Sequence, residues 1–331
     1  MLKLQKERND TVISVQDLSV RFYLASGVVN AVENLSFNVR KGVGFGIVGE
    51  SGSGKTVTAL TIMGLLARPP GRIDSGKILY NGTNLLTTSQ EDMRRLRGKS
   101  IAMVYQDPMT SLNPVLRVCF QIAEALMVHE KISQHEAEAR AVELMSAVGI
   151  PDAEKRAKEY PHQFSGGMRQ RIMIAMALAT KPDLLIADEP TTALDVITQS
   201  QILALLEDLQ RKHDMTVILV THDLGIVAQL CDEALVMYAG HGMELNTVKD
   251  IFSHSKHPYT RGLLESTTRV DKEISRLSSI PGNIPDMIDP PTGCRFHPRC
   301  PLADNRCARQ EPPAFLQVSG GYSKCWRSEP T

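Results

Sequence analysis

The chain has 331 residues, 42% of them hydrophobic, and its 37 Lys and Arg balance its 37 Asp and Glu to a formal net charge of zero. This composition can fill a globular core, and the neutral charge gives no general attraction to nucleic acid or to anionic lipid. The longest apolar runs, at 184–187 and 217–220, are far shorter than the roughly 20 residues that cross a bilayer. Residues 1–10 lack the apolar core of a secretory signal. We therefore expect a cytoplasmic protein that neither spans a membrane nor binds nucleic acid.

Antiparallel strands are expected at the beginning of the chain. Apolar and polar positions alternate between residues 12 and 48, as in half-buried strands, and Ser26-Gly27 indicates a hairpin turn. The run Phe45–Val48 is typical of a buried strand, and the apolar spacing from Thr56 to Leu66 predicts a helix. The glycine-rich loop between that strand and that helix therefore has the context of a phosphate-binding loop.

This loop carries the pattern G-x-x-x-x-G-K-[ST]. Its glycines let successive backbone N–H groups turn toward a phosphate, and the N-terminus of the following helix adds positive potential. Lys55 is expected to hold the β- and γ-phosphates of a nucleotide, and the Thr56 hydroxyl to bind Mg²⁺. A surface glycine turn is the alternative, which the flanking strand and helix make improbable. The expected nucleotide-binding residues of the loop are Gly49, Ser51, Gly52, Ser53, Gly54, Lys55 and Thr56.

The middle of the chain is predicted to be helical and to be followed by a parallel sheet. The pattern is helical and charged from about 115 to 160, and the apolar runs at 184–187 and 216–220 resemble buried strands of an α/β core. Pro and Gly accumulate at 254–260 and 281–298, which places a domain boundary near residue 268. The predicted fold class is α/β, with an antiparallel β subdomain, a helical subdomain at about 107–180, a main domain at 1–268 and a small tail domain at 269–331.

Two acidic residues end the apolar run at 184–187. Asp188 suits the coordination shell of Mg²⁺, and Glu189 suits the orientation or deprotonation of an attacking water. Two acids at the end of a strand could also form a solvated turn. Together with a phosphate loop on an earlier strand, however, they define a P-loop NTPase.

A third motif lies between these two, in the segment Phe164–Arg171, before a helix rich in Ala and Met that runs to about Ala179. It resembles the signature motif of ABC ATPases, in which Ser and Gly backbone groups at a helix N-terminus contact the γ-phosphate bound by the opposite subunit. Phe164 stands where Leu is commoner and Met168 where many members have Gln, and neither departure changes the assignment. The residues that match the contacting groups are Ser165, Gly166 and Gly167.

Further landmarks of ABC ATPases follow in order. Gln106 follows the strand 101–105, Thr192–Asp195 follows the two acids, and His222 follows the strand that ends at Val220. The resemblance implies that Gln106 links the γ-phosphate and Mg²⁺ to a transmembrane partner, that Asp195 bridges a dimer, and that His222 contacts the γ-phosphate and positions water. The implied catalytic residues are Glu189, His222 and Gln106, and the implied Mg²⁺ contacts are Thr56, Gln106 and Asp188.

Phe22 matches the aromatic residue that stacks on adenine in this family, and a plain strand aromatic is the less favoured alternative. One subunit holds only half of each ATP site in ABC ATPases. The resemblance therefore implies that two subunits close around ATP and separate after hydrolysis.

Three short strings resemble sequences of the peptide and nickel importer group of ABC transporters. They are Tyr105–Pro114, His257–Thr260 and Gly293–Pro301. The resemblance to this group covers nearly the whole chain. This resemblance implies import of di- or oligopeptides, with a nickel complex or glutathione as alternative cargo. The implied partners are a second ATPase subunit in a heterodimer or a homodimer, two transmembrane permease subunits, and an extracytoplasmic substrate-binding protein that acts through the permease. The implied location is the cytoplasmic face of the cell membrane, as a peripheral protein.

Four of the six cysteines crowd into the tail with the spacing C-x5-C-x6-C-x17-C. Paired C-x2-C steps of zinc ribbons are absent from this spacing, but four thiolates can bind either zinc or an iron–sulfur cluster. A reducing compartment disfavours a disulfide. The tail of the importer group resembles an iron–sulfur segment, which favours a [4Fe–4S] cluster over zinc, with a structural or regulatory role. The expected ligands are Cys294, Cys300, Cys307 and Cys325.

Two other readings compete with a transporter ATPase. A soluble ABC protein of DNA repair or translation is disfavoured, because the chain has one phosphate loop, no sustained heptads between 56 and 164, and no net positive charge. A metal-dependent sensor that uses the nucleotide only as a switch is disfavoured by the presence of both Glu189 and His222, which indicate turnover. We therefore expect an ATPase.

Overall fold

The computed structural model describes residues 10–107, 111–192, 194–266, 280–318 and 320–329. The chain divides into two compact units, the first formed by Met1–Thr87 with Leu219–Thr331 and the second by Thr88–Ile218. The predicted domain boundary near 268 lies outside the described residues and stays a prediction. Pro108, Met109 and Thr110 of the importer-like string, and Ala193, also lie outside them.

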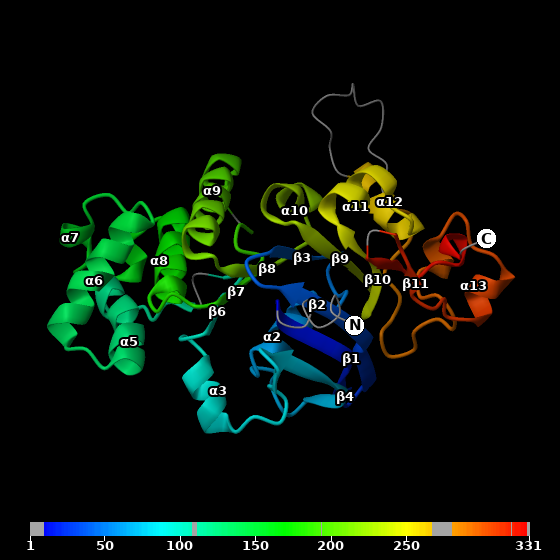
Figure 1. Cartoon of the computed structure of the whole chain (residues 1–331), viewed down its shortest axis with the longest axis horizontal. Helices are drawn as coiled ribbons and strands as arrows, with labels where there is room; N and C mark the ends of the chain where they lie inside the picture. Colours follow the sequence, from blue (N-terminus) through cyan, green and yellow to red (C-terminus); the bar gives the residue numbers. More distant parts are fainter. Residues whose placement is uncertain (1–9, 108–110, 193, 267–279, 319, 330–331) are drawn as a thin grey trace. The chain divides into compact units, whose positions relative to one another are not determined.

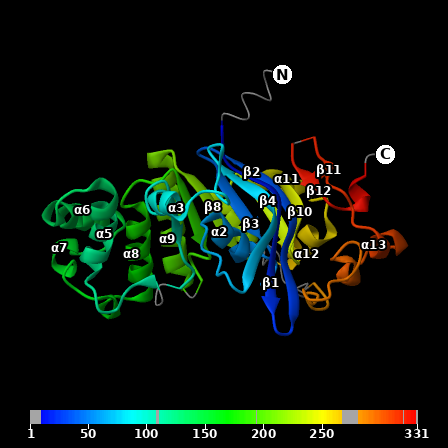
Figure 2. The same cartoon turned by 90° about the horizontal axis from the view of Figure 1, so that it is seen from below.

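The first unit opens with an antiparallel sheet in the strand order β2-β1-β4-β5. Strand β1 (Thr11–Leu24) pairs with β2 (Gly27–Arg40), and Leu24 lies opposite Gly27, so Ala25-Ser26 forms the turn. This confirms the predicted hairpin. Strand β4 (Gly71–Tyr80), which the sequence did not predict, pairs with the other edge of β1 and leads to the short β5 (Thr83–Asn84). Figure 2 shows β1, β2 and β4 side by side.

A second sheet of the first unit has the order β11-β12-β10-β9-β3. The fully buried β3 (Gly44–Val48) runs parallel to β9 (Glu233–Tyr238), and β10 (His241–Thr247) pairs antiparallel with β9. The tail strands β12 (Tyr322–Ser323) and β11 (Phe315–Leu316) extend the sheet beyond β10. The predicted strand at 45–48 is therefore confirmed, and the tail joins the sheet that carries it.

Short helices complete the first unit. They are α2 (Lys55–Ile62), α10 (Leu224–Leu230), α11 (Val248–His254), α12 (Pro258–Ser266) and α13 (Asn305–Arg309). Short 3-10 helices span His297–Arg299 and Trp326–Ser328. Helix α2 is shorter than the predicted 56–66. It ends at Ile62 because Gly64 adopts a left-handed φ of 63°, the usual conformation at a helix C-terminus.

The second unit holds the parallel pair β6 (Ile101–Val104) and β7 (Leu184–Asp188), both predicted. Helices α5 (Val118–Glu130), α6 (Gln134–Ala147), α7 (Ala153–Arg156) and α8 (Gly166–Leu178) form one group, green in Figure 1. This confirms the predicted helical stretch. Side-chain caps begin α6 at Ser133 and α8 at Ser165, each accepting a backbone N–H from the first helical turn.

Three further elements belong to this part of the chain. Helix α3 (Gln90–Leu96) precedes β6, and helix α9 (Val196–His213) follows β7. The chain returns to the first unit at Leu219, within β8 (Thr216–Thr221). The predicted strand at 216–220 is confirmed. Among the described residues, no helix combines the length and the apolar character needed to cross a membrane.

Candidate functional site

The phosphate loop joins β3 to α2, as predicted. Gly54 lies at φ 100°, and a Cβ at this position would approach the backbone oxygen of Ala31 to 2.5 Å, so only glycine fits here. The Lys55 side chain is buried, and its Nζ donates to the carbonyl oxygens of Gly49 at 2.8 Å and Glu50 at 3.0 Å. The lysine ammonium therefore lies along the inside of the loop, where phosphate groups would bring it new acceptors.

The other polar groups of the loop differ in their surroundings. The Ser53 hydroxyl is buried, and no hydrogen-bond partner is present for it among the described residues. By contrast, Thr56 in the first turn of α2 is exposed, and so are Ser51 and Gly52 in the loop. A buried hydroxyl without a partner beside a buried ammonium makes the loop fit for an anionic ligand with several oxygen acceptors.

In the second unit, the two acids at the end of β7 take different environments. Asp188 is buried, with 3% of its surface exposed, whereas Glu189 is half-buried. Glu189 also has a φ of 46°, in the left-handed region that non-glycine residues rarely occupy. Such a conformation costs about 1–3 kcal/mol and is concentrated at functional sites. The backbone at Glu189, directly after the buried Asp188, is therefore strained.

Glu189 is held by two neighbouring side chains. Gln106, just beyond β6, donates from Nε2 to Oε2 of Glu189 at 2.9 Å, and Thr192 donates from its hydroxyl to the same oxygen at 2.8 Å. The structure thus brings together two of the residues expected to act in hydrolysis. Thr192 is a partner that the sequence showed only as part of a motif, since hydroxyls three residues after an acid are common in turns.

The signature segment and Asp195 also come together within the second unit. Ser165 caps α8 by accepting the Met168 N–H, and Asp195 caps α9 by accepting the Thr198 N–H at 2.9 Å and the Thr198 hydroxyl at 2.7 Å. These bonds, the backbone one first, lower the pKa of the Asp195 carboxyl below its ordinary value. A Cβ on Gly167 would come within 2.4 Å of the Thr198 methyl, so glycine permits this contact.

The signature segment begins with a buried residue and continues with exposed ones. Phe164 is 3% exposed, and the Arg156 guanidinium lies 5.6 Å from its ring centroid. Ser165 and Gly166 are exposed. The aromatic residue in the unusual position therefore packs into the helical group and leaves the ligand-facing groups unobstructed.

Two expected residues of the first unit lie apart from its phosphate loop in the sequence. His222 is exposed directly after β8, and Phe22 is half-buried in β1, opposite Val29 of β2 and Gly71 of β4. The role of Phe22 in stacking on adenine stays a prediction.

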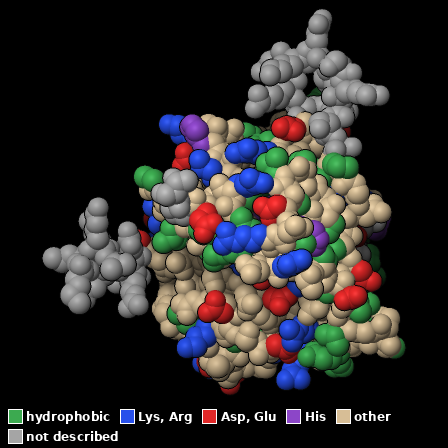
Figure 3. Space-filling model, turned by 90° about the vertical axis from the view of Figure 1, so that its right-hand side faces the viewer, with side chains coloured by type: hydrophobic (Ala, Val, Ile, Leu, Met, Phe, Trp, Pro, Cys, Tyr) green, Lys and Arg blue, Asp and Glu red, His purple; other side chains and the backbone are tan. Residues whose placement is uncertain are grey.

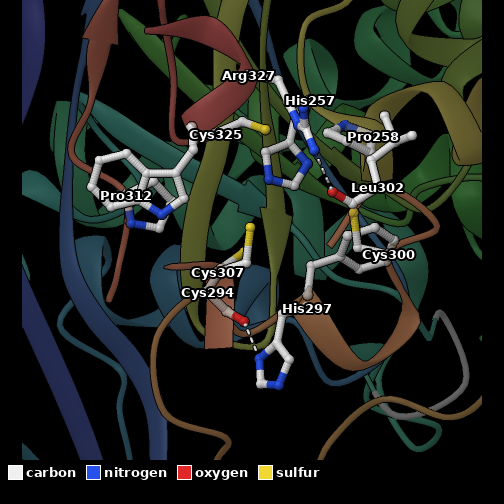
Figure 4. Close-up of a pocket in the computed structure, with 12 residues that line it drawn as sticks. His257, Pro258, Cys294, His297, Cys300, Leu302, Cys307, Pro312, Cys325 and Arg327 are labelled. Atoms are coloured by element: carbon white, nitrogen blue, oxygen red, sulfur yellow. Dashed lines mark hydrogen bonds between the residues drawn. The ribbon is translucent and has the colours of Figure 1, made fainter. Parts of the chain in front are cut away.

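The four tail cysteines line one pocket (Figure 4). They come from four places in the tail, and His257, His297 and Trp326 line the same pocket. All six cysteines of the chain are free. Burial, followed by the nearby Cys325, Cys307 and Cys300, raises the pKa of the Cys294 thiol to about 12. A thiophilic ligand that binds Cys294 would therefore have to displace its proton.

Despite this gathering, the described part of the chain contains no group of three or more His, Cys, Asp or Glu side chains placed to hold a metal ion. Four thiolates on a single zinc ion lie about 2.3 Å from the metal, and hence close to one another. The tail cysteines are therefore not arranged as a preformed metal site.

The surface drawn in Figure 3 carries positive and negative side chains side by side, without a large patch of one sign. This face agrees with the zero net charge of the chain.

Comparison with known proteins assigns the chain to a family. Residues 32–192 match the family model of ABC transporters, and residues 243–307 match the C-terminal region of oligopeptide and dipeptide transporters. The chain is 50% identical to the dipeptide transport ATP-binding protein DppD of Bacillus subtilis over 96% of its own length and 95% of the relative. It is 49% identical to the oligopeptide transport ATP-binding protein OppD of Escherichia coli over 98% of its own length and 95% of that relative.

Solved structures agree with this assignment. A dimeric post-hydrolysis structure of the ATP-binding cassette MJ0796 bound to ADP and phosphate matches with a TM-score of 0.64 at 26% identity, over 71% of this chain and 98% of that one. The structure of cbiO1 from Clostridium perfringens matches with a TM-score of 0.62 at 28% identity, over 74% of this chain and 92% of that one. The order of motifs, the fold and the near-complete alignment to curated relatives show that the chain belongs to the ABC transporter family, among its ATP-binding proteins.

Proposed function

We propose that the chain is the ATP-hydrolysing subunit of a transporter that imports di- or oligopeptides. The observation that carries the peptide assignment is the match of residues 243–307 to the C-terminal region of oligopeptide and dipeptide transporters, because the ATP-site residues are indifferent to cargo. The dipeptide and oligopeptide transport proteins that share about half of their residues with the chain support the same assignment. As an ABC-type ATPase, the chain converts ATP and water to ADP and phosphate.

The phosphate loop supplies the nucleotide-binding half of the proposal. Backbone N–H groups from Gly49 to Gly54 would surround the β-phosphate, and the Lys55 ammonium would exchange its two carbonyl acceptors for phosphate oxygens. The buried Ser53 hydroxyl gains an acceptor in the same exchange. Phe22 would stack on the adenine ring. These contacts act on ground state and transition state alike, so they determine affinity more than turnover.

Hydrolysis is assigned to the acids that follow β7. Glu189 would orient the attacking water and accept its proton, while Gln106 and Thr192 hold the carboxylate in place from the same side. Mg²⁺, when bound by Thr56, Asp188 and Gln106, would neutralise charge that develops on the phosphate oxygens. His222 would contact the γ-phosphate and help to position the water.

A second ATPase subunit completes each site in this proposal. Ser165, Gly166 and Gly167 at the N-terminus of α8 would present backbone N–H groups to the γ-phosphate held by the partner. Asp195 would bridge the two subunits, and its lowered pKa keeps it ionised for that contact. We favour a heterodimer over a homodimer. The dimer would sit at the cytoplasmic face of the membrane on two permease subunits, which receive cargo from an extracytoplasmic substrate-binding protein.

We also propose that Cys294, Cys300, Cys307 and Cys325 hold a [4Fe–4S] cluster. What supports the proposal is that the four side chains line one pocket, which gathers the four thiolates that such a cluster needs. Burial raises the pKa values of Cys294, Cys300 and Cys325, so loading has to release protons. Zinc is the alternative occupant.

The cluster proposal is tested by purifying the full chain without oxygen and measuring iron, acid-labile sulfide and zinc, together with the visible absorption spectrum. We expect about four irons and four sulfides per chain and a loss of both in Cys300→Ser. Cys119→Ser, which changes a buried cysteine of α5, is the matched control and should keep the cluster. One zinc per chain without sulfide would replace the cluster by zinc, and the absence of both would reject the site.

The cargo is tested on the complete transporter in liposomes, with its binding protein supplied in excess. We expect ATP turnover to rise several-fold with a di- or oligopeptide and to stay at the basal rate with a nickel complex or with glutathione. Stimulation by nickel or glutathione alone would replace the peptide assignment by one of those cargoes. ATP turnover that is independent of any permease would instead favour a soluble nucleotide switch.

A further inference from the structure

The cysteine-bearing tail reaches the phosphate loop through Arg299. Its guanidinium forms a two-pronged ion pair with the carboxylate of Glu50, the second residue of the loop, with Nη1–Oε2 at 2.7 Å and Nη2–Oε1 at 3.1 Å. The side chain of Arg299 is only 5% exposed. Two-pronged pairs of this kind are the most directional contacts that an arginine makes. The geometry therefore fixes both the distance and the orientation of Glu50.

Tail and strand groups fix Arg299 in turn. Nε donates to the carbonyl oxygen of Pro281 at 2.9 Å, and Nη2 donates to that of Ile280 at 3.2 Å. Nη1 also donates to the hydroxyl of Tyr238, at the end of β9, at 3.3 Å. The guanidinium is consequently anchored on the tail before it reaches the loop, so it acts as a fixed support for Glu50.

A residue of α12 holds the backbone of the same loop position. The N–H of Glu50 donates to the hydroxyl of Tyr259 at 3.0 Å. Tyr259 is fully buried, and its ring lies 4.7 Å from that of Tyr238 and 5.2 Å from that of Phe296. Phe296 lies between two pocket-lining cysteines in the sequence, so the cysteine segment packs directly against the tyrosine that holds the Glu50 N–H.

Glu50 is thus held at each of its polar groups. Arg299 pairs with its carboxylate, Tyr259 accepts its N–H, and its carbonyl oxygen accepts the Nζ of Lys55 at 3.0 Å. Through Glu50, the tail is linked to the lysine that is proposed to hold the phosphates. A displacement of Arg299 would therefore be transmitted to Lys55 through one residue.

An independent contact from the same segment supports the other side of the loop. Arg295 donates to the carbonyl oxygen of Ala239 and pairs with Glu33, and the N–H of the next residue, Gly240, donates to the carbonyl oxygen of Ser53 at 3.0 Å. The two arginines flank Phe296 and adjoin Cys294 and Cys300 in the sequence. The tail therefore supports the loop at both Glu50 and Ser53.

We propose that Arg299 is a positioning residue for nucleotide binding, which acts through Glu50 to hold the phosphate loop in the conformation that accepts ATP. The inference rests on the proposed role of this loop in ATP binding. It makes the tail a part of the nucleotide site. Arg299 does not touch the nucleotide, and its effect is on affinity for ATP and for ADP alike, because the loop holds the phosphates that both share.

The test compares ATP and ADP affinity in the full chain with KM and kcat in the assembled transporter. Arg299→Gln is expected to weaken both affinities about tenfold, in line with the loss of a hydrogen-bonded charged group, and to raise KM with little change in kcat. Arg299→Lys keeps the charge but not the two-pronged contact, so it should restore affinity in part. Glu50→Gln should match Arg299→Gln, and the double variant should be no weaker than either single one.

The matched control is Arg306→Gln, which breaks an ion pair with Glu329 elsewhere in the tail and should leave affinity unchanged. Lys55→Ala separates the two proposals. If Lys55→Ala binds ATP like the native chain, the proposed role of the loop fails. If Lys55→Ala loses binding while Glu50→Gln and any folded Arg299 variant bind normally, the positioning role of Arg299 is overturned. Additive losses in the double variant would also overturn it, since they would mean that Arg299 does not act through Glu50.

Discussion

At the scale of single residues, the most informative contact is the one that restrains Glu189. The carboxylate combines a left-handed backbone with two hydrogen bonds to one oxygen, from Gln106 and Thr192. A base held in this way keeps its second oxygen in a defined direction, which is what the orientation of a water molecule requires. The Thr192 hydroxyl is therefore expected to support catalysis without contacting the nucleotide.

The substitution Thr192→Val tests this restraint, because it keeps the shape of the side chain and removes the donor. We expect kcat to fall about tenfold, the usual scale for a hydrogen bond to a charged group, while ATP affinity stays unchanged. Steady-state turnover and equilibrium nucleotide binding give the two quantities. Thr83→Val, at an exposed position of β5, is the control. A normal kcat in Thr192→Val would show that Gln106 alone suffices.

At the scale of elements, the N-termini of α8 and α9 meet where the signature segment contacts the residues after Asp195. Asp195 fixes Thr198 through two hydrogen bonds, and the Thr198 methyl occupies the space that a Cβ on Gly167 would need. The neighbouring Gly166 has its nearest such contact at 3.9 Å, from Leu194. The two glycines of the motif therefore differ in the steric demand placed on them.

This difference predicts opposite outcomes for two alanine substitutions. Gly167→Ala should destabilise the folded chain by about 1–3 kcal/mol through overpacking, whereas Gly166→Ala should not. Thr198→Ser removes the methyl and keeps the hydroxyl, so it should restore the stability of Gly167→Ala. Chemical unfolding measures the stability of Gly166→Ala, Gly167→Ala, Thr198→Ser and the double variant that combines Gly167→Ala with Thr198→Ser. Equal stability of Gly166→Ala and Gly167→Ala, or no recovery with Thr198→Ser, would contradict the steric account.

Local patterns predicted those elements whose signal lies within a few residues. Alternation predicted the β1–β2 hairpin, and the apolar runs predicted β3, β7 and β8. Strand β4 was not predicted, because its polar residues and Gly76, at a φ of 102°, interrupt the alternation of apolar and polar positions that marks a strand. The end of α2 was missed because apolar residues continue the helical spacing past Gly64, whose backbone conformation the spacing does not reveal.

At the scale of the whole molecule, the contacts that matter most join distant parts of the sequence. Glu50 and Arg299 are 249 residues apart, and no local pattern distinguishes this arginine from the others in the tail. The phosphate loop, the acids and the signature could be predicted because each depends on a short motif. Their supports, Thr192, Tyr259 and Arg299, could not, because their roles depend on which segments the fold brings together.

The attachment of the tail to β10 predicts a dependence of stability on pH. Burial would raise the pKa of Glu311, but its hydrogen bond with His241 and the charges of His241 and Lys324 lower it to about 2 from an ordinary 4.5. Because the unfolded chain takes up this proton first, Glu311 stabilises the fold above pH 4.5, and this contribution is lost as the pH falls toward 2.

Glu311→Gln should therefore flatten the pH dependence of the free energy of unfolding between 4.5 and 2. Urea unfolding at a series of pH values measures the slope. Glu265→Gln, at an exposed position of α12, is the control and should keep the native slope. An unchanged slope in Glu311→Gln would mean that the ion pairs of Glu311 do not contribute to acid stability.

The central claim is that this chain hydrolyses ATP with Glu189 as its catalytic carboxylate, and ATP turnover by the transporter that carries Glu189→Gln tests it most directly. We predict that turnover falls by about 10²-fold or more, as when a general base is lost, while ATP binding persists. Glu143→Gln, at an exposed position of α6, should turn over ATP like the native chain. Undiminished turnover in Glu189→Gln would contradict the account and remove Glu189 from its catalytic role.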